Sequence, residues 1–262
     1  MAAFLNEEHM KRITRICAAG FVAALLGLVT VASATADEIR VAVASNFADT
    51  LREIAGRFEQ QSGHRVTLMS GSTGMHYAQI KNGAPFDAFF AADMKRPRLL
   101  EEEGATLADS RFTYAVGKLV LWSPNADYVD PAGELLEQGD FRHLALANPK
   151  LAPYGRAARE VLEKRRQWQD LQDRMVRGEN IGQTFQFVKS GNAELGFVAW
   201  SQIQRPGQPL TGSWWEIPAA LYSPIEQQAV LLKANPVARD FLTFVRGNEA
   251  LRIIGAYGYG TP

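Results

Sequence analysis

The stretch IRVAVASNFADTLREIAGRF, residues 39–58, decides the fold class of this chain. Its first six residues, Ile39 to Ala44, form a short apolar run rich in β-branched side chains, which is typical of a buried strand. Apolar residues then recur at helical spacing after the polar pair Ser45-Asn46: Leu51, Ile54, Ala55 and Phe58. The stretch therefore predicts a strand that leads through a polar turn into a helix.

The same unit recurs twice downstream. Residues 66–69 are predicted as a strand, 71–74 as a turn and 75–81 as a short helix. Residues 87–91 are predicted as a third strand, and a further helix follows Asp93. Strands that alternate with helices are typical of a parallel sheet covered by helices on both faces.

A long apolar run, residues 114–122, comes next, with Gly117 in its middle. It fits a strand that crosses between two lobes, and it fits a long hairpin about as well. The alternation then restarts, with strands and helices expected at 144–147, 154–164, 181–188 and 195–198. An irregular connection rich in Pro and Gly, 206–218, precedes a strand at 228–232 and a helix over 237–245.

These patterns predict an α/β fold of two lobes. The first lobe is expected to hold residues 37–120 and 224–262, and the second residues 121–223, because the chain would cross near residue 120 and return near residue 224. Two crossings suit hinge closure of the lobes around a ligand. We expect the protein to act as a monomer.

The amino-terminal region has the pattern of a secretory signal peptide. Basic residues (Lys11, Arg12 and Arg15) precede an apolar run over residues 16–31 and the small-residue sequence Ala34-Thr35-Ala36. The run is shorter than the ~20 residues of a membrane-spanning helix. We expect cleavage after Ala36 and a mature protein in the periplasm; the alternative is an uncleaved amphipathic anchor.

Composition narrows the classes of function. Three of the 28 basic and two of the 28 acidic side chains precede Asp37, so the mature chain has 25 against 26 and a net charge of −1. A nucleic-acid-binding protein would normally show a basic excess. The single cysteine, Cys17, lies in the predicted signal peptide, so no disulfide, thiolate nucleophile or cysteine metal site is expected after cleavage.

Four polar or proline-containing turns stand where helices are expected to begin: Ser45-Asn46, Ser72-Thr73, Pro153-Tyr154 and Asn180-Ile181. None of them contains Lys or Arg. A helix N-terminus presents unpaired N–H groups and the positive end of its dipole, so it can bind an anion without a charged side chain. The alternative for each turn is simple capping by Ser, Thr or Asn, with Tyr154 and Ile181 as packing residues.

Signatures of enzymes are weak. The turn over residues 71–74 lacks both the Gly-x-Ser-x-Gly pattern of hydrolases and the Gly-Lys-Ser/Thr ending of a phosphate-binding loop. The mature chain's three histidines are scattered without metal-ligand spacing: His64, His76 and His143. Asp87 and Asp93 flank a strand and could form a carboxylate pair, or they could cap the next helix and anchor the lobe.

Several segments resemble the periplasmic molybdate-binding proteins of bacterial molybdate ABC importers. The longest are VAVASNF (41–47), GSTGMHYAQI (71–80) and NGAPFDAFFAAD (82–93). Shorter ones follow in the same order: LANP (146–149), PYG (153–155), GENI (178–181) and LGFV (195–198). The resemblance covers essentially the whole mature chain.

This resemblance implies a type II periplasmic binding protein that holds molybdate or tungstate between two lobes and delivers it to a membrane permease. The implied ligand-binding residues are Ser45, Asn46, Ser72 and Thr73 in the first lobe and Tyr154 and Ile181 in the second. Ile181 would act through its backbone amide, and Tyr154 through its amide or its hydroxyl. Some members have a tyrosine where this chain has Ala199 and then Trp200, and Thr73 stands where serine is usual.

The chemistry of the turns favours an anion that only accepts hydrogen bonds. Molybdate is a dianion without protons near neutral pH, whereas phosphate often keeps one and favours a site with an acceptor. No Asp or Glu lies in the four turns, although Asp49 and Glu179 are close. No cofactor is expected. Two alternatives stay open: a binding protein for sulfate or an organic acid, and an enzyme or receptor domain on the same scaffold.

Overall fold

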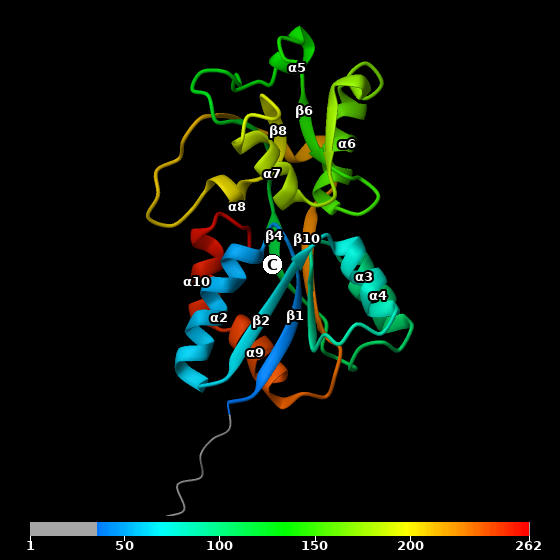
Figure 1. Ribbon diagram of the computed structural model, residues 1–262, viewed down its shortest axis with the longest axis vertical. Coiled ribbons are helices and arrows are strands. Elements are labelled where there is room, and N and C mark those ends of the chain that lie inside the picture. The colour runs from blue at the N-terminus through cyan, green and yellow to red at the C-terminus, as the bar shows by residue number, and fades with distance from the viewer. Residues whose placement is uncertain (1–35, 262) are drawn as a thin grey trace, which may run out of the picture. The chain divides into compact units, whose positions relative to one another are not determined.

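The computed structural model describes residues 36–261, and two five-stranded sheets organise them (Figure 1). The predicted signal peptide and Cys17 fall within residues 1–35, outside the described part of the chain. From Asp37 onward the chain forms one compact unit. Among the described residues, no helix has both the length and the apolar character needed to span a membrane.

The first sheet contains strands from both ends of the described chain. Its order is β2-β1-β3-β10-β4. The strands are β1 (Glu38–Ala44), β2 (Arg65–Gly71), β3 (Ala88–Ala91), β4 (Phe112–Gly117) and β10 (Ile225–Leu231). β1 is parallel to β2 and β3, whereas β10 is antiparallel to β3 and β4.

The second sheet repeats this arrangement with the order β7-β6-β8-β5-β9. Its strands are β5 (Leu119–Ser123), β6 (Leu144–Ala147), β7 (Met175–Gly178), β8 (Leu195–Ala199) and β9 (Ser213–Glu216). β6 is parallel to β7 and β8, whereas β5 is antiparallel to β8 and β9. The prediction of parallel sheets was therefore wrong for one strand in each sheet: β10 and β5 arrive from the other lobe and run antiparallel to both of their neighbours.

Helices cover the sheets. Around the first sheet lie α2 (Ala48–Ser62), α3 (Thr73–Lys81), α4 (Lys95–Glu102), α9 (Pro236–Val245) and α10 (Asn248–Ala256). Figure 1 shows α2, α9 and α10 on one side of this sheet and α3 and α4 on the other, as expected. The second sheet has α5 (Leu135–Gln138), α6 (Pro153–Lys164), α7 (Ile181–Lys189) and α8 (Trp200–Ile203), with the 3-10 turns η1 (Gln172–Arg174) and η2 (Ala219–Leu221) nearby.

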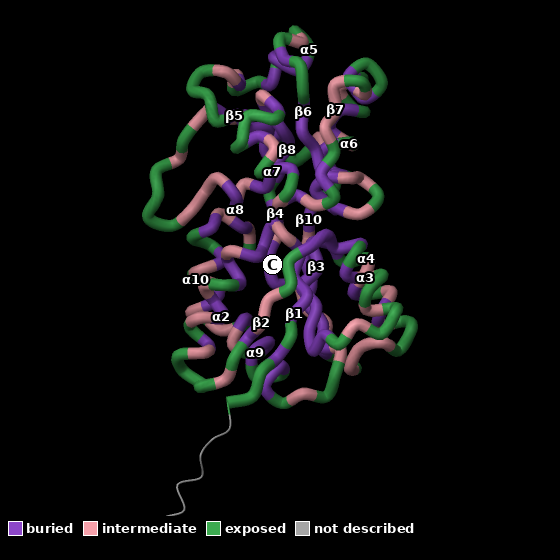
Figure 2. The backbone as a smooth tube through the Cα atoms, in the orientation of Figure 1, coloured by how far each residue is buried: buried purple, intermediate pink, exposed green. Residues whose placement is uncertain are grey.

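Alternation along β1 explains how one strand serves two faces. Val41 and Val43 pack with α2 and α9, whereas Ala42 faces the cluster that includes Leu100 of α4. All three β1 residues are fully buried, and the neighbouring β3 is purple in Figure 2. A strand buried on both faces reads as a continuous apolar run, which is the pattern seen in the sequence.

The apolar run at 114–122 consists of two strands, β4 and β5, that belong to different sheets and are separated by Lys118. The run therefore crosses between lobes, and the hairpin alternative is wrong. The chain returns to the first sheet between β9 and β10. The lobe limits expected at residues 120 and 224 remain a prediction, close to these two connections.

Candidate anion-binding site

The four turns singled out in the sequence meet at one cavity between the lobes. All six predicted ligand residues line it, together with backbone neighbours of each turn: Ala44, Ser45, Asn46, Gly71, Ser72, Thr73, Ala92, Ala152, Pro153, Tyr154, Asn180 and Ile181. The space open to the centre of a water molecule is about 10 Å³. This is a small space, so the cavity in this conformation favours a small compact ligand over an extended organic one.

The lining contains no Asp, Glu, Lys or Arg. Its polar groups are hydroxyls, side-chain amides and the backbone groups of helix N-termini. The electrostatic attraction for an anion must therefore come from N–H groups and helix dipoles, which act without a fixed charge.

The first turn of α3 leaves one backbone donor unused. Ser72 is the N-cap, and its Oγ accepts from Met75 N at 3.3 Å. Gly74 N donates to the Leu151 oxygen at 2.8 Å, which joins α3 to the second lobe. Thr73 N makes no hydrogen bond to any residue in 36–261, and it belongs to the wall of the cavity.

The first turn of α7 has the same organisation. Asn180 caps it by accepting from Gln183 N at 2.9 Å, and Gly182 N donates across the lobes to Ser45 Oγ at 3.0 Å. Ile181 N has no acceptor among the described residues. Gln202 holds this residue on its carbonyl side, because its Nε2 donates to the Ile181 oxygen at 3.1 Å.

Helix α6 begins with Pro153, which has no N–H, so Tyr154 offers the first backbone donor of the helix. Gly155 fixes where this N-terminus lies. A Cβ on Gly155 would stand 2.1 Å from the Ala147 oxygen at the end of β6. Only glycine allows the helix to begin this close to the strand, which brings Tyr154 to the cavity.

Hydroxyl groups line the first-lobe side of the cavity. Thr73 Oγ1 accepts from Ala92 N at 3.0 Å, and Ser45 Oγ accepts from Gly182 N. A hydroxyl that accepts a hydrogen bond keeps its own proton for donation. Threonine in place of serine therefore keeps a hydroxyl that is held in position and can still donate a hydrogen bond.

The Tyr154 hydroxyl reaches from the second lobe to the first sheet. It accepts from Gln227 Nε2 of β10 at 3.3 Å. Burial raises the pKa of Tyr154 well above its ordinary value, so the phenol stays protonated at neutral pH. Asn46 bonds to the same glutamine: its Nδ2 donates to Gln227 Oε1 at 2.8 Å and to the Tyr259 hydroxyl at 3.1 Å.

Charged residues near the site are engaged elsewhere. Arg156 is 45% exposed and faces Glu160, 3.9 Å away. Asp49 of the first lobe pairs with Arg205 of the second and with Arg52 of its own helix. These contacts agree with an uncharged cavity that has ion pairs only around it.

Asp87 and Asp93 do not act as a pair. Asp87 precedes β3 and accepts from Arg40 N at 2.8 Å, whereas Asp93 follows the strand and accepts from Arg96 N at 3.0 Å in the first turn of α4. The anchoring and capping roles are therefore confirmed. Arg96 also donates to the Lys150 oxygen at 3.0 Å, a further link between the lobes.

His76 is a satisfied interior residue, in agreement with its lack of metal-ligand spacing in the sequence. Its Nδ1 lies 3.0 Å from the Gln79 side chain and its Nε2 lies 3.2 Å from the Val43 oxygen. Burial lowers the pKa of His76. Within residues 36–261, no group of three His, Cys, Asp or Glu side chains could hold a metal ion.

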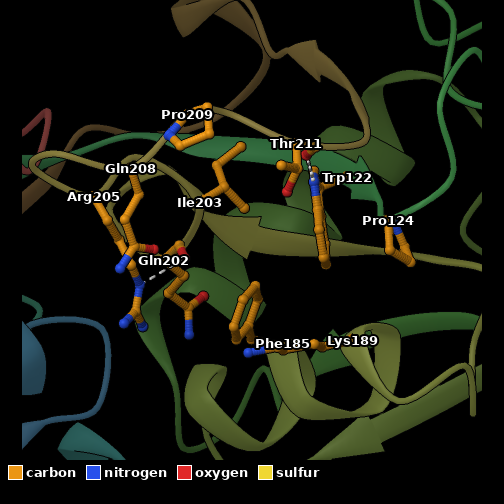
Figure 3. A pocket seen from close by; sticks show the side chains of 10 residues that line it. All are labelled: Trp122, Pro124, Phe185, Lys189, Gln202, Ile203, Arg205, Gln208, Pro209 and Thr211. Atoms are coloured by element: carbon orange, nitrogen blue, oxygen red, sulfur yellow. Dashed lines mark hydrogen bonds between the residues drawn. The ribbon is translucent and has the colours of Figure 1, made fainter.

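A larger pocket of about 230 Å³ lies in the second lobe (Figure 3). Its aromatic residues are Trp122 and Phe185, whose ring centroids lie 5.3 Å apart with the planes tilted by 31°. Its cations are already placed: Lys189 lies 5.9 Å from the Phe185 ring, and Arg205 pairs with Asp49. This pocket has no set of unused N–H donors like that of the cavity, so it is the weaker candidate for an anion.

Sequence reasoning missed two buried glutamines beside the site. Gln202 links the Ala199 nitrogen, at 2.9 Å, to Ile181, and Gln227 contacts both Asn46 and Tyr154. The signal available for Gln227 was a polar pair, Gln227-Gln228, inside an apolar strand. Ala199, which stands where some members of the resembled family have a tyrosine, does not line the cavity.

Comparisons with known proteins agree with this architecture. The family model for bacterial extracellular solute-binding proteins matches residues 39–260. The molybdate-binding protein ModA of Azotobacter vinelandii is 50% identical over 231 residues, which is 87% of this chain and 92% of that protein. ModA of Rhodobacter capsulatus is 44% identical over 256 residues, or 96% and 100% of the two chains. The solved periplasmic molybdate-binding protein of Azotobacter vinelandii matches with a TM-score of 0.83 and 44% identity, over 86% of this chain and 99% of that one.

Proposed function

Because this chain belongs to the bacterial extracellular solute-binding proteins and, within them, to the molybdate-binding proteins called ModA, we propose that it binds molybdate between its lobes for an ABC importer. It is a binding protein and not an enzyme. It works in the periplasm after removal of residues 1–36, and it delivers its ligand to the membrane permease of the importer.

The observation that carries this proposal is the uncharged cavity with unused backbone donors. Thr73, Tyr154 and Ile181 each offer an N–H at the start of a helix, and the hydroxyls of Ser45 and Thr73 add donors from the side. Hydrogen bonds to an ionised partner are about twice as strong as neutral ones, so a small dianion gains most from such a site.

The same donors favour molybdate over phosphate. Phosphate often retains a proton near neutral pH and needs an acceptor for it, and no carboxylate lines the cavity. Tungstate has the shape and charge of molybdate, so it binds as well. Sulfate is smaller than molybdate, so the size of the cavity must separate the two anions.

A calorimetric titration of residues 37–262 with molybdate, tungstate, sulfate and phosphate tests the proposal. We expect tight binding of molybdate and tungstate with a stoichiometry of one, and much weaker binding of the other two. Tight sulfate binding, with molybdate ignored, would assign the protein to a different oxyanion. The mass of the exported protein tests whether it begins at Asp37.

Scattering in solution tests the lobe movement. We expect a monomer whose radius of gyration decreases when molybdate is added, because ligand contacts come from both lobes. A radius that does not change at saturation would count against closure of the lobes on the ligand.

A further inference from the structure

Gln227 is a fully buried polar residue in the strand that brings the chain back from the second lobe. It pairs with Ala115 of β4, and the register of the pairing shifts between Gln227 and Gln228. Such an irregularity redirects side chains and is common next to functional sites. Both glutamines are buried here, although neighbours in a regular strand point to opposite faces.

The amide of Gln227 joins residues that line the cavity from opposite lobes. Its Oε1 accepts from Asn46 Nδ2 at 2.8 Å and from the Tyr114 hydroxyl at 3.0 Å. Its Nε2 donates to the Tyr154 hydroxyl at 3.3 Å. Asn46 belongs to the first lobe and Tyr154 to the second, so one side chain holds both.

Gly117 provides the space for this contact. A Cβ on Gly117 would stand 2.2 Å from the Tyr154 hydroxyl and 2.6 Å from Gln227 Nε2. Any larger residue at the crossing between the lobes would therefore separate the two groups. The absence of a side chain at Gly117 is an independent sign that the Tyr154–Gln227 contact is built into the fold.

The direction of these hydrogen bonds determines what the site presents. Because Gln227 Nε2 donates to the Tyr154 oxygen, the phenolic proton is turned toward another acceptor. Both Nδ2 hydrogens of Asn46 are also used, by Gln227 and Tyr259, and Asn46 Oδ1 has no donor among the described residues. The Tyr154 proton is thus the group whose bonding a bound oxyanion can complete, whereas Asn46 Oδ1 only accepts and cannot bond to an anion that carries no proton.

We propose that Gln227 is a positioning residue of the oxyanion site, which orients Asn46 and the Tyr154 hydroxyl through its two amide ends. The inference rests on the proposed function. Gln227 does not line the cavity, so it acts on the ligand only through these two residues.

Gln227→Met tests this role, with Gln228→Met as the matched control. Gln228 is equally an interior amide, but it bonds to Thr113 Oγ1 at 3.1 Å and to Arg111 at 3.0 Å, away from the cavity. We expect Gln227→Met to raise the Kd for molybdate about tenfold, the effect of losing one well-oriented hydrogen bond. Gln228→Met should change the Kd less than twofold, even where both variants lose the same amount of thermal stability.

Two further variants complete the test. Gly117→Ala keeps both polar groups and only moves them apart, so it should weaken molybdate binding even if Gln227→Met does not fold. Tyr154→Phe should cost less affinity in the Gln227→Met background than in the wild type, because the hydroxyl has already lost its orientation.

The inference is wrong if Gly117→Ala and every folded Gln227 variant bind molybdate within twofold of the wild type, or if Gln228→Met loses as much affinity as Gln227→Met. A wild-type protein that does not bind molybdate would refute the proposed function itself. A wild type that binds, with variants that bind equally well, would refute only the role of Gln227.

Discussion

The two lobes line the cavity with different chemical groups. The first lobe presents side-chain hydroxyls, Ser45 and Thr73, each of which is held by a backbone N–H that it accepts. The second lobe presents backbone N–H groups at Tyr154 and Ile181, whose side chains are buried. The first half therefore depends on these side chains as well as on the Thr73 N–H at the start of α3, whereas the second depends on where two helices begin.

The largest effect should come from removing a backbone donor in the second lobe. Ile181 is the first residue of α7, a position where proline is favoured, and Asn180 before it is extended, with φ −145° and ψ 169°. Ile181→Pro therefore deletes the N–H and leaves the helix intact. We expect a loss of about 3 kcal/mol in molybdate binding, the upper end for a hydrogen bond to a charged partner, measured by calorimetry.

Ile181→Val is the control for this variant. It keeps the N–H and most of the buried side chain, so its affinity should equal that of the wild type. If the proline variant binds as well as the valine variant, the amide of Ile181 is not a ligand contact and the second lobe holds the anion in another way.

Removing a hydroxyl from the first lobe should have a somewhat smaller effect. Thr73→Ala deletes the donor and leaves Ala92 N without its acceptor. We expect a loss of about 2 kcal/mol in binding. Thr73→Ser restores the hydroxyl and should recover the affinity, because the methyl group contributes only packing. A serine variant as weak as the alanine variant would show that the methyl group and not the hydroxyl matters.

Acid should weaken the first lobe through His76 of α3. Burial lowers its pKa in the folded protein below the ordinary value of 6.5, so the unfolded chain takes up a proton first as the pH falls. The contribution of His76 to the free energy of unfolding is fully present above pH 6.5. It decreases below that pH, by at most about 1.4 kcal/mol per pH unit. Thermal unfolding between pH 7.5 and 5 should show a steeper loss for the wild type than for His76→Gln. Parallel curves would remove His76 from the explanation.

The smallest effect should come from a nearby positive charge. Arg156 lies two residues after Tyr154 but is exposed and faces Glu160. Exposed ion pairs contribute at most about 1 kcal/mol, and this one does not touch the cavity. Arg156→Gln should therefore change the affinity for molybdate less than twofold in the same salt. A loss greater than that of Thr73→Ala would mean that the anion is held chiefly by charge.

The sequence of each segment was sufficient to predict most helices and the buried parallel strands, because its hydrophobic periodicity and its turn residues indicate the same element. It was not sufficient for β9, which lies in a segment rich in Pro and Gly and is a strand only because it pairs with β5. The direction of β10 was also hidden, since an antiparallel strand buried on both faces has the same apolar run as a parallel one. These features depend on contacts between residues far apart in the chain.

The helix starts that line the cavity could be predicted because capping residues mark them. What no local pattern contains is which N–H groups remain unused after the lobes meet. The N–H groups of Gly74 and Gly182 donate to the opposite lobe, whereas those of Thr73 and Ile181 have no acceptor among the described residues. The role of the six residues as ligands remains a prediction that the variants above address.

The hydrogen bonds from Gly74 to Leu151 and from Gly182 to Ser45 also bear on kinetics. They connect the lobes through the same helix turns whose remaining donors line the cavity. If the lobes part as proposed, these bonds break and the donors of the two halves move away from each other in one movement. The residence time of the anion would then be the waiting time for that opening, and a permease that separates the lobes would shorten it without touching the ligand.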